Sequence, residues 1–310
     1  MIIQEHVPLA DKNWFETGGS ARYFCQPKNG QEFKQALEFA TLHALSVFVL
    51  GSGANIVISD DGFDGLIIHP QCLDLFVHAE NTALLTAGAG VTMNNLIEYT
   101  LSHNLTGLEV FSNIPGTVGG SVYINLHYFE YFLSHFLVSA HVINTTTYEI
   151  EKVDLAWFNF GYDQSTLMNK QYYLVDATFK LSPSTDTEVA YARGRRFEII
   201  RHRVSRYPKA KTCGSFFRNF HDDEVTLLWE GKKMKFVAFY LDKIGVKGTE
   251  HVGGAWVSSQ HANMLVNKEN ATSHDIITLA RRLQEKVQKE FGIVPQPECI
   301  FLGFKEYPLL

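Results

Sequence analysis

The segment IPGTVGG occupies residues 114–120, and a related segment, GSGAN, occupies residues 51–55. Each places small residues and backbone N–H groups in a turn between strand-like runs. Glycine accepts positive φ angles and lets the main chain approach a ligand closely, so such loops can cradle a pyrophosphate. One loop of this kind is typical of an ordinary turn. Both together, with AGAG at residues 87–90, favour a dinucleotide held by loops rather than by a helix N-terminus.

Neither loop carries a common nucleotide-binding fingerprint. The GxGxxG opening of a nicotinamide-binding Rossmann unit is absent from both, and so is the lysine of a P-loop. The glycine-rich loops therefore indicate a nucleotide but do not by themselves say which one.

Composition narrows the class of protein. The chain has 310 residues, of which 45% are hydrophobic and 19% charged, so we expect a folded protein of two domains or of one domain with an appendage. The formal net charge of −6 argues against nucleic acid as the main partner, because phosphate binding favours basic surfaces. An anionic small substrate is still compatible, since one local cationic pocket can lie on an acidic protein.

The patterns of cysteine, histidine and hydropathy argue against a disulfide-linked, metal-binding, secreted or membrane-spanning protein. The four cysteines never form a CxxC pair, which predicts reduced thiols in a cytoplasm rather than disulfides or a zinc site. The 13 histidines show no HExxH spacing, so we expect no metal. The N-terminal segment lacks the pattern of a secretory signal, and no run approaches the length of a membrane span.

Local patterns predict an α+β protein with mixed sheets. A helix is expected over 31–43, with Phe33, Ala36, Leu37 and Ala40 on one face. The clearest helix spans 275–291, capped by Thr272 or Ser273 and stopped by Gly292. A basic stretch, 193–211, opens a third region of the chain. Strands are expected within segments 46–69, 83–104, 135–144, 172–181 and 261–267, and an amphipathic segment at 235–248.

A family resemblance rests on six blocks that together span residues from about 15 to 300. In chain order these are FETGGSARYF (15–24), LGSGANIVISDDGFDGLII (50–68), GLEVFSNIPGTVGGSVYIN (107–125), GSFFRN (214–219), GVKGTEHVGGAWVSSQHANMLVN (245–267) and FGIVPQPE (291–298). The chain resembles the UDP-N-acetylenolpyruvoylglucosamine reductase family, the MurB flavoproteins of peptidoglycan synthesis.

The resemblance implies an α+β fold with a two-lobed FAD-binding domain of the vanillyl-alcohol-oxidase/PCMH type, followed by an α+β substrate-binding domain. The corresponding limits are 1–195 for the FAD-binding domain, with lobes at about 1–75 and 76–195, then 196–300 for the substrate-binding domain and 301–310 for a tail. The short connection before GSFF resembles the branch of the family that lacks an extra substrate-capping loop.

The same resemblance implies noncovalent FAD, with NADPH as co-substrate and a UDP-sugar as substrate in the same cleft in turn. We expect a cytoplasmic monomer that binds neither nucleic acid nor membrane. The FAD contacts would be Gly51, Ser52, Gly53, Ala54, Asn55, Ile56, Pro115, Gly116, Thr117, Gly119 and Gly120.

The reaction implied by the family passes hydride from NADPH to the flavin and from the flavin to the enolpyruvyl double bond. Such a site needs a proton donor and groups that stabilise an enolate-like charge. By analogy Ser215 is the donor and Glu298 assists. Taken alone, Ser215 reads as a strand start and Glu298 as a surface carboxylate. Cys213 has no histidine arranged beside it, so we interpret it as packing.

Four residues match substrate contacts of the family: Tyr162, Arg218, Asn219 and Lys247. Arg218, Asn219 and Lys247 are candidates for the diphosphate or the sugar. Lys247 could equally be a solvated turn lysine. The basic stretch that contains Arg201, Arg203 and Lys209 suits an anionic ligand, although such a run is often only a solvated helix face.

Three departures from the family pattern mark a divergent member. Asp163 stands in FGYDQS (160–165) where an arginine that stabilises the enolate is expected, and an acidic group there would repel the charge. The bulky run NLHYFEYF (125–132) replaces a small, glycine-containing one, and Asn113 replaces a glycine. Candidates for a substitute cation are Arg193, Arg203 and Arg218.

Three hypotheses about function follow. The first is the enolpyruvyl reductase, which the retention of Ser215 and Glu298 favours. The second is an FAD-dependent oxidoreductase on the same scaffold with another substrate, which Asp163 keeps open. The third is a flavin-binding homologue with impaired catalysis. Flavin colour separates the third from the others, and substrate-dependent NADPH oxidation separates the first two.

Overall fold

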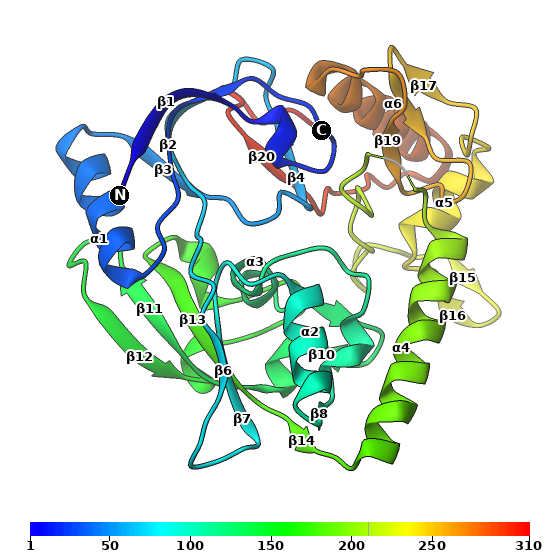
Figure 1. The fold of residues 1–310 in the computed structure, drawn as a ribbon. Helices are drawn as coiled ribbons and strands as arrows, with labels where there is room; N and C mark the ends of the chain where they lie inside the picture. The colour runs from blue at the N-terminus through cyan, green and yellow to red at the C-terminus, as the bar shows by residue number, and fades with distance from the viewer. Residues whose placement is uncertain (210) are drawn as a thin grey trace. The chain divides into compact units, whose positions relative to one another are not determined.

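The chain divides into two units of internal contacts in the computed structural model, which describes residues 1–209 and 211–310 (Figure 1). Unit 1 consists of Met1–Glu5, Tyr23–Ser52 and Gly65–Arg203, and unit 2 consists of His6–Arg22, Gly53–Asp64 and Val204–Leu310. Three strands contain residues of both units: β1 (Ile3–Pro8), β2 (Ser20–Cys25) and β5 (Phe63–Ile68). Unit 2 is therefore assembled from three separate stretches of sequence.

Unit 1 is built on a five-stranded antiparallel sheet of order β12-β11-β13-β7-β6. Small side chains lie opposite one another across its middle, since Ala177 of β13 pairs with Ala140 on one side and Ala87 on the other. They leave room for helix α3 (Val118–Tyr123), which contacts β13 and β7. The strands are β6 (Leu75–Val77), β7 (Leu84–Gly88), β11 (Leu137–Asn144), β12 (Ile150–Asp154) and β13 (Tyr172–Lys180).

Two amphipathic helices complete the cores of unit 1. Helix α1 (Gly30–Leu42) buries the four residues expected from its spacing, so that prediction is confirmed. Asn29 caps it by accepting a hydrogen bond from the Glu32 N–H at 2.9 Å. Helix α2 (Met93–Ser102) buries an apolar face of Met93, Leu96, Ile97 and Leu101. Burial of such a face, rather than intrinsic propensity, stabilises helices this short.

Helix α4 (Asp186–Arg206) accounts for most of the basic stretch. Only Val189 and Ala192 are buried along its 21 residues. Arginines hold it instead: Arg195 pairs with Glu109 of η2 (Leu108–Phe111), and Arg196 pairs with Glu98 of α2 at 2.7 Å. The predicted domain limit at residue 195 lies inside this helix and stays a prediction.

The remaining elements of unit 1 are short. They are β3 (Ser46–Val49), which pairs with β5 in parallel, β8 (Leu105–Thr106), β9 (His127–Tyr128), β10 (Tyr131–Phe132), η3 (Leu133–His135), η4 (Ala156–Phe158), η5 (Thr166–Asn169) and β14 (Ser182–Pro183).

Unit 2 packs its helices around one apolar cluster that includes Phe15 and Val57 from the early segments as well as Leu283 of α6. Helix α6 (Ser273–Phe291) ends at Gly292, whose φ is 70°, so the predicted C-terminal end is confirmed. It begins two residues before the predicted position 275, at a Thr272–Asp275 capping box, so Thr272 is the cap and Ser273 is inside the helix. The other elements are η1 (Ala10–Lys12), β4 (Ile56–Ile58), β15 (Leu228–Trp229), β16 (Lys232–Lys233), α5 (Val237–Lys243), β17 (His251–Val252), β18 (Ala255–Val257), β19 (Leu265–Asn267) and β20 (Ile300–Leu302).

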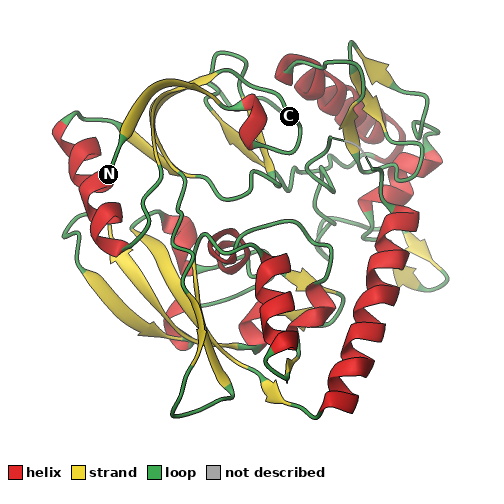
Figure 2. Cartoon of the chain, viewed as in Figure 1, coloured by secondary structure: helices red, strands yellow, loops and turns green. Residues whose placement is uncertain are grey.

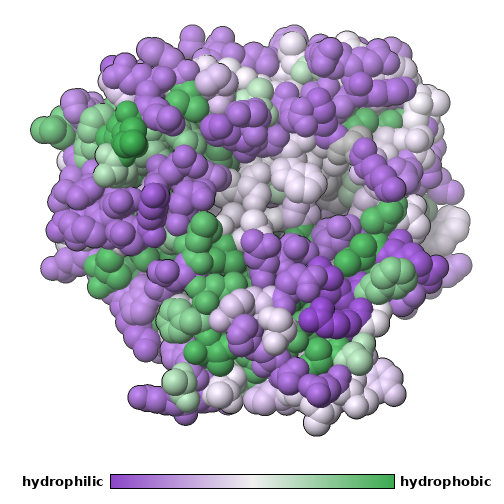
Figure 3. Space-filling view, viewed as in Figure 1, coloured by the Kyte–Doolittle hydropathy of each residue, from purple (hydrophilic) through white to green (hydrophobic). Residues whose placement is uncertain are grey.

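The C-terminal segment 301–310 belongs to unit 2. Leu309 is buried in its core, and the Leu310 N–H donates to Gln284 at 3.1 Å. Helices and strands occur in both units (Figure 2), which confirms the α+β class. Hydrophilic residues cover most of the face shown in Figure 3. Among residues 1–209 and 211–310, no helix is long and apolar enough to cross a membrane.

Candidate active site

The IPGTVGG segment lies beside the AGAG segment in unit 1. The Val118 N–H donates to Val91 at 2.8 Å, and the Gly119 N–H donates to Ala89 at 2.9 Å. Thr117 caps α3 by accepting from the Gly120 N–H at 3.3 Å. The segment thus ends in a short helix, where the sequence favoured a loop alone. Two glycines concealed this helix, because glycine disfavours helices and the backbone bonds to residues 89 and 91 are tertiary.

The GSGAN segment has the close approach that glycine allows. A Cβ on Gly51 would lie 2.6 Å from Thr117 Oγ1, so this position in unit 1 leaves no space for a side chain. In unit 2, Gly53 has a φ of 64°, and its Cβ would lie 2.3 Å from the Lys12 carbonyl oxygen. The N–H groups of Ser52, Gly53 and Ala54 donate to no group within residues 1–209 and 211–310.

These features fit a bound dinucleotide. Backbone N–H groups without protein partners in a glycine turn are suitable donors to phosphate oxygens. The tight approach of Gly51 to Thr117 brings two of the predicted FAD-binding segments together within unit 1. The other predicted FAD residues of the GSGAN segment, Gly53 to Ile56, belong to unit 2.

The GSFF segment of unit 2 is held by one buried amide. Asn263 Nδ2 donates to the Phe217 carbonyl at 2.7 Å, and Asn263 Oδ1 accepts from the Phe217 N–H at 3.1 Å. The Phe216 N–H also donates to the Asn263 carbonyl at 2.8 Å. Sequence reasoning missed Asn263, although a polar residue inside the apolar run HANMLVN was a signal for it.

The structure brings together the two predicted catalytic segments. The Glu298 N–H donates to the Phe216 carbonyl at 2.8 Å, next to a bridge between Phe217 and Pro297. Ser215 Oγ has no hydrogen-bond partner among the residues that the structure describes, so no protein group competes for its proton.

Glu298 is also tied to the end of the GSGAN segment. Asn55 Nδ2 donates to the Glu298 carbonyl at 3.4 Å, and the Ile300 N–H donates to the Asn55 carbonyl at 3.0 Å. Strand β20 then continues in parallel with β4, where Ile300 lies opposite Ile56. A predicted FAD segment and a predicted catalytic residue are therefore neighbours within unit 2.

Three predicted substrate residues of unit 2 already have protein partners. Arg218 binds Glu224 through two hydrogen bonds of 2.7 Å, and these bonds lower the pKa of the Glu224 carboxyl to about 2 against the opposing effect of burial. Lys247 pairs with Asp242 at 3.2 Å, and Asn219 accepts from the Val237 N–H at 3.4 Å. A substrate phosphate would share these side chains with the protein, and their substrate role stays a prediction.

Two of the sequence departures lie together in unit 1. His127 Nδ1 lies 3.4 Å from Asp163 Oδ1, and the side chains are 23% and 25% exposed. The His127 ring also lies 4.4 Å, centroid to centroid, from the ring of the predicted substrate residue Tyr162. The side chain that the structure places at Asp163 is thus a histidine, which sequence reasoning did not consider as a substitute for the expected arginine.

Cys213 is buried in the core of unit 2 beside Cys299. Burial, and secondly contact with Cys213, raises the pKa of the Cys299 thiol well above its ordinary value. The burial of the Cys213 side chain in this apolar cluster agrees with a packing role.

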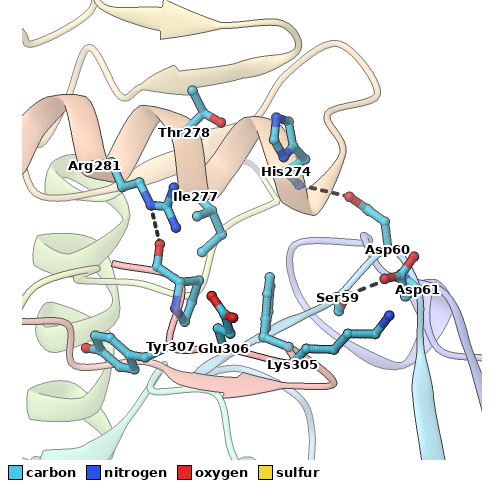
Figure 4. Close-up of a pocket in the computed structure, with 12 residues that line it drawn as sticks. Ser59, Asp60, Asp61, His274, Ile277, Thr278, Arg281, Lys305, Glu306 and Tyr307 are labelled. Atoms are coloured by element: carbon cyan, nitrogen blue, oxygen red, sulfur yellow. Dashed lines mark hydrogen bonds between the residues drawn. The ribbon is translucent and has the colours of Figure 1, made fainter. Parts of the chain in front are cut away.

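A cavity of about 420 Å³ in unit 2, which sequence reasoning did not predict, lies at the start of α6 (Figure 4). Asp60 closes the helix end by accepting from the N–H groups of Ser273 and His274, both at 2.9 Å. Arg281 donates to the Pro308 carbonyl on another wall. The lining mixes both charge signs, with Asp61 and Glu306 beside Lys305.

Comparison with known proteins first defines the class. Residues 21–151 match the model of an FAD binding domain, so the chain is a flavoprotein with an FAD-binding domain of the predicted PCMH type. Residues 206–302 match the C-terminal domain of UDP-N-acetylenolpyruvoylglucosamine reductase.

The chain belongs to the UDP-N-acetylenolpyruvoylglucosamine reductase family. A relative of that name from Synechococcus sp. (strain JA-3-3Ab) is 32% identical over 99% of this chain and 94% of its own length. One from Gloeobacter violaceus is 32% identical over 97% of this chain and 96% of its own length. The crystal structure of the reductase (MurB) from Thermus caldophilus is similar with a TM-score of 0.77 at 25% identity, covering 97% of this chain and all of that one.

Proposed function

We propose that this chain reduces the enolpyruvyl group of UDP-N-acetylglucosamine enolpyruvate to give UDP-N-acetylmuramate, with NADPH as the electron donor. Family membership over nearly the whole chain supports the substrate class. In this reaction one hydride and one proton add across the C=C bond, and NADPH leaves as NADP⁺. FAD, when bound, would supply the two-electron redox chemistry that connects the nicotinamide to the substrate.

The observation that carries the proposal is the uncommitted Ser215 hydroxyl on a strongly held segment. Asn263 holds the backbone on the C-terminal side of Ser215 by hydrogen bonds. The Ser215 Oγ itself donates to no described residue. A serine hydroxyl is a weak acid, so it protonates carbon only when it is held in place and the carbon is strongly basic. We assign Ser215 as the proton donor, and solvent then reprotonates its oxygen.

Glu298 is assigned as the second catalytic residue. Its backbone is bonded on one side to Phe216 and on the other to Asn55, which limits its movement relative to the GSFF segment. A carboxyl group held in this way can orient the substrate while charge develops. Arg218, Asn219 and Lys247 of the same unit are proposed as substrate contacts, and Tyr162 of unit 1 stays a predicted substrate residue.

A stopped-flow experiment on the Ser215→Ala variant tests the assignment. Flavin reduction by NADPH should be retained, while reoxidation of the reduced flavin by UDP-N-acetylglucosamine enolpyruvate should fall by about 10²–10⁴-fold, the usual contribution of a positioned acid. Ser215→Cys is the matched variant, since it keeps a proton on a side chain of similar size. Equal reoxidation rates in wild type and Ser215→Ala would exclude Ser215 as the donor.

One observation favours a second candidate, a flavoenzyme of the same scaffold with another substrate. Asp163 places a negative charge where the family pattern expects a positive one. In that case NADPH would reduce the flavin, but the enolpyruvyl nucleotide would not reoxidise it.

A cytoplasmic location, a monomeric state and the lack of a nucleic-acid partner stay predictions.

A further inference from the structure

The proposed reaction requires positive charge beside the substrate carboxylate. As hydride reaches the double bond, negative charge moves toward that carboxylate, and a cation or hydrogen-bond donor aimed there lowers the barrier. The chain has a carboxylate, Asp163, in the segment where the family pattern expects this cation. The charge must therefore come from another side chain, or the reaction would be slow.

His127 is the basic side chain that the structure places against Asp163. The two side chains approach to 3.4 Å through Nδ1 and Oδ1, and each is about three-quarters buried. Partial burial strengthens such a pair relative to a fully exposed one. The imidazole lies near two aromatic rings, with the Tyr162 centroid at 4.4 Å and the Phe132 centroid at 5.5 Å. Aromatic rings attract cations, so these neighbours are compatible with an imidazolium.

The two segments that carry the pair are fastened to each other. Asn125 Nδ2 donates to the Gly161 carbonyl at 3.0 Å, and Ser165 Oγ donates to the Tyr123 carbonyl at 2.6 Å. Asp163 has a φ of 51°, a conformation that aspartate and asparagine tolerate better than most residues. This turn aims residue 163 at His127. The pair is therefore held by bonds on both sides of it rather than by chance contact of surface side chains.

The geometry also decides which nitrogen is available. Nδ1 faces the carboxylate, and Nε2 has no hydrogen-bond partner among the residues described. With a proton on Nδ1, a neutral ring presents a lone pair at Nε2, whereas an imidazolium presents an N–H group. A neutral ring with its proton on Nδ1 cannot donate from Nε2 to an anionic oxygen, whereas the imidazolium can. A carboxylate that orients an imidazole so that its far nitrogen can act is a recurrent catalytic arrangement.

We propose that His127, oriented by Asp163, supplies the positive charge that stabilises the developing enolate of the substrate. His127 would contact the substrate carboxylate, and Asp163 would act as a positioning residue. This inference rests on the proposed function. It explains two departures from the family pattern as one change, since Asp163 removes a cation and His127 returns one.

The arginines that could have served are engaged within their own units. Arg193 pairs with Glu98 at 3.3 Å, Arg203 donates to the Asn113 carbonyl at 3.2 Å, and Arg218 binds Glu224. Other charged or titratable groups occur on the elements near His127. Besides Asp163, these are Tyr162, Tyr128, Glu130, Tyr131, His135, Arg203 and Glu109.

The test compares flavin reoxidation by the enolpyruvyl nucleotide in four holoenzymes at one fixed pH. His127→Gln should lower this rate about 10²–10³-fold, since it removes a charge-stabilising donor. Asp163→Asn should lower the rate less, because the imidazole is still present but is no longer oriented by a carboxylate. The control is His141→Gln, which breaks a second His–Asp pair, 2.9 Å from Asp176, and should match wild type.

A rescue variant and a direct measurement keep the test decisive. His127→Gln combined with Asp163→Arg should recover rate, because a guanidinium then supplies the positive charge. NMR of the histidine ring in oxidised holoenzyme should show the His127 signal shift on addition of UDP-N-acetylmuramate, while the His141 signal stays in place. Unchanged flavin reduction by NADPH shows that a variant is folded.

The outcomes separate this inference from the proposed function. If wild type does not transfer electrons to the enolpyruvyl nucleotide at all, the proposed function fails. If wild type does so and His127→Gln retains its rate, the role of His127 is overturned while the function stands. A His127 signal insensitive to the product also overturns it. A rate loss in His127→Gln that the added Asp163→Arg does not rescue shows a structural role and overturns the charge assignment.

Discussion

Replacement of Arg195 by alanine tests how the IPGTVGG segment is supported. Glu109 lies five residues before that segment, and its side chain is fully buried. One carboxylate oxygen faces the Arg195 guanidinium, and the other accepts from the Gly107 N–H at 2.7 Å. The Glu109 backbone carbonyl accepts from Ser112 Oγ at 2.6 Å, directly before the segment. Arg195→Ala would leave a buried carboxylate without its cation.

The magnitude follows from the burial of the two partners. Removing one partner of a fully buried ion pair costs about 3–5 kcal/mol. The Arg195 side chain is 54% exposed, so water screens part of the interaction, and the Gly107 N–H still satisfies one oxygen. We therefore expect a loss of about 2–3 kcal/mol in the free energy of unfolding, the range for a hydrogen bond to a charged group.

Two comparisons isolate the contribution of the Arg195–Glu109 ion pair to the free energy of unfolding. Arg201→Ala on the same helix removes a pair with Glu198 whose side chains are 72% and 59% exposed, and it should cost under about 0.5 kcal/mol. Glu109→Gln removes the buried charge. In that background, Arg195→Ala should lower the free energy of unfolding by about 1 kcal/mol less than it does in wild type.

Urea unfolding at one fixed FAD concentration measures these values, because bound ligand adds to apparent stability. FAD affinity of Arg195→Ala, titrated by flavin fluorescence, should fall as the supported segment loosens. Equal costs for Arg195→Ala and Arg201→Ala would refute the reasoning, and so would strict additivity in the double variant.

Three further results are expected. Gly51→Ala places a Cβ 2.6 Å from Thr117 Oγ1, so it should displace the α3 cap, cost about 1 kcal/mol and weaken FAD binding measurably by fluorescence; unchanged affinity would contradict this. Gly194→Ala, in the middle of α4 with no atom within 4 Å of the added Cβ, should instead raise the unfolding free energy by about 0.5–1 kcal/mol. The pKa of Glu224 is lowered from 4.5 to about 2 in the folded protein, so its ionised carboxylate stabilises the fold above pH 4.5, and this stabilisation is lost as the pH falls toward 2. At pH 7 the free energy of unfolding of Arg218→Ala should be about 1 kcal/mol below that of wild type. This difference should shrink when unfolding is measured closer to pH 2.

Local patterns predicted those elements whose stability is local. The four buried positions of α1 and the C-terminal end of α6 follow from spacing and capping residues that lie within the segment itself. Short-range rules fail for α3, because its glycines oppose a helix and its support comes from residues 89 and 91. In each case, hydrophobic periodicity predicts a helix only when the apolar spacing and the capping residues lie within the helical segment itself.

The polar contacts of the site were harder to predict because they join distant parts of the chain. His127 and Asp163 were recognised as unusual but were treated separately, since 36 positions separate them and no rule of spacing links them. Arg195 was one of several arginines in a basic stretch, and the buried acid that selects it, Glu109, lies 86 positions earlier. The fold, and not the basic sequence itself, decides which arginine of the stretch has a structural role.

The interleaved path of the chain has a consequence for dissecting the protein. The C-terminal family domain begins at residue 206, yet unit 2 also needs Phe15 and Val57 for its core and β4 as the partner of β20. A fragment cut at that position would expose an unpaired strand edge and a hole where two apolar side chains belong. We expect it to aggregate when expressed alone, and to be recovered only when the N-terminal segments are supplied in trans. A recombination event that exchanged the C-terminal third between relatives would therefore also have to match residues near the N-terminus.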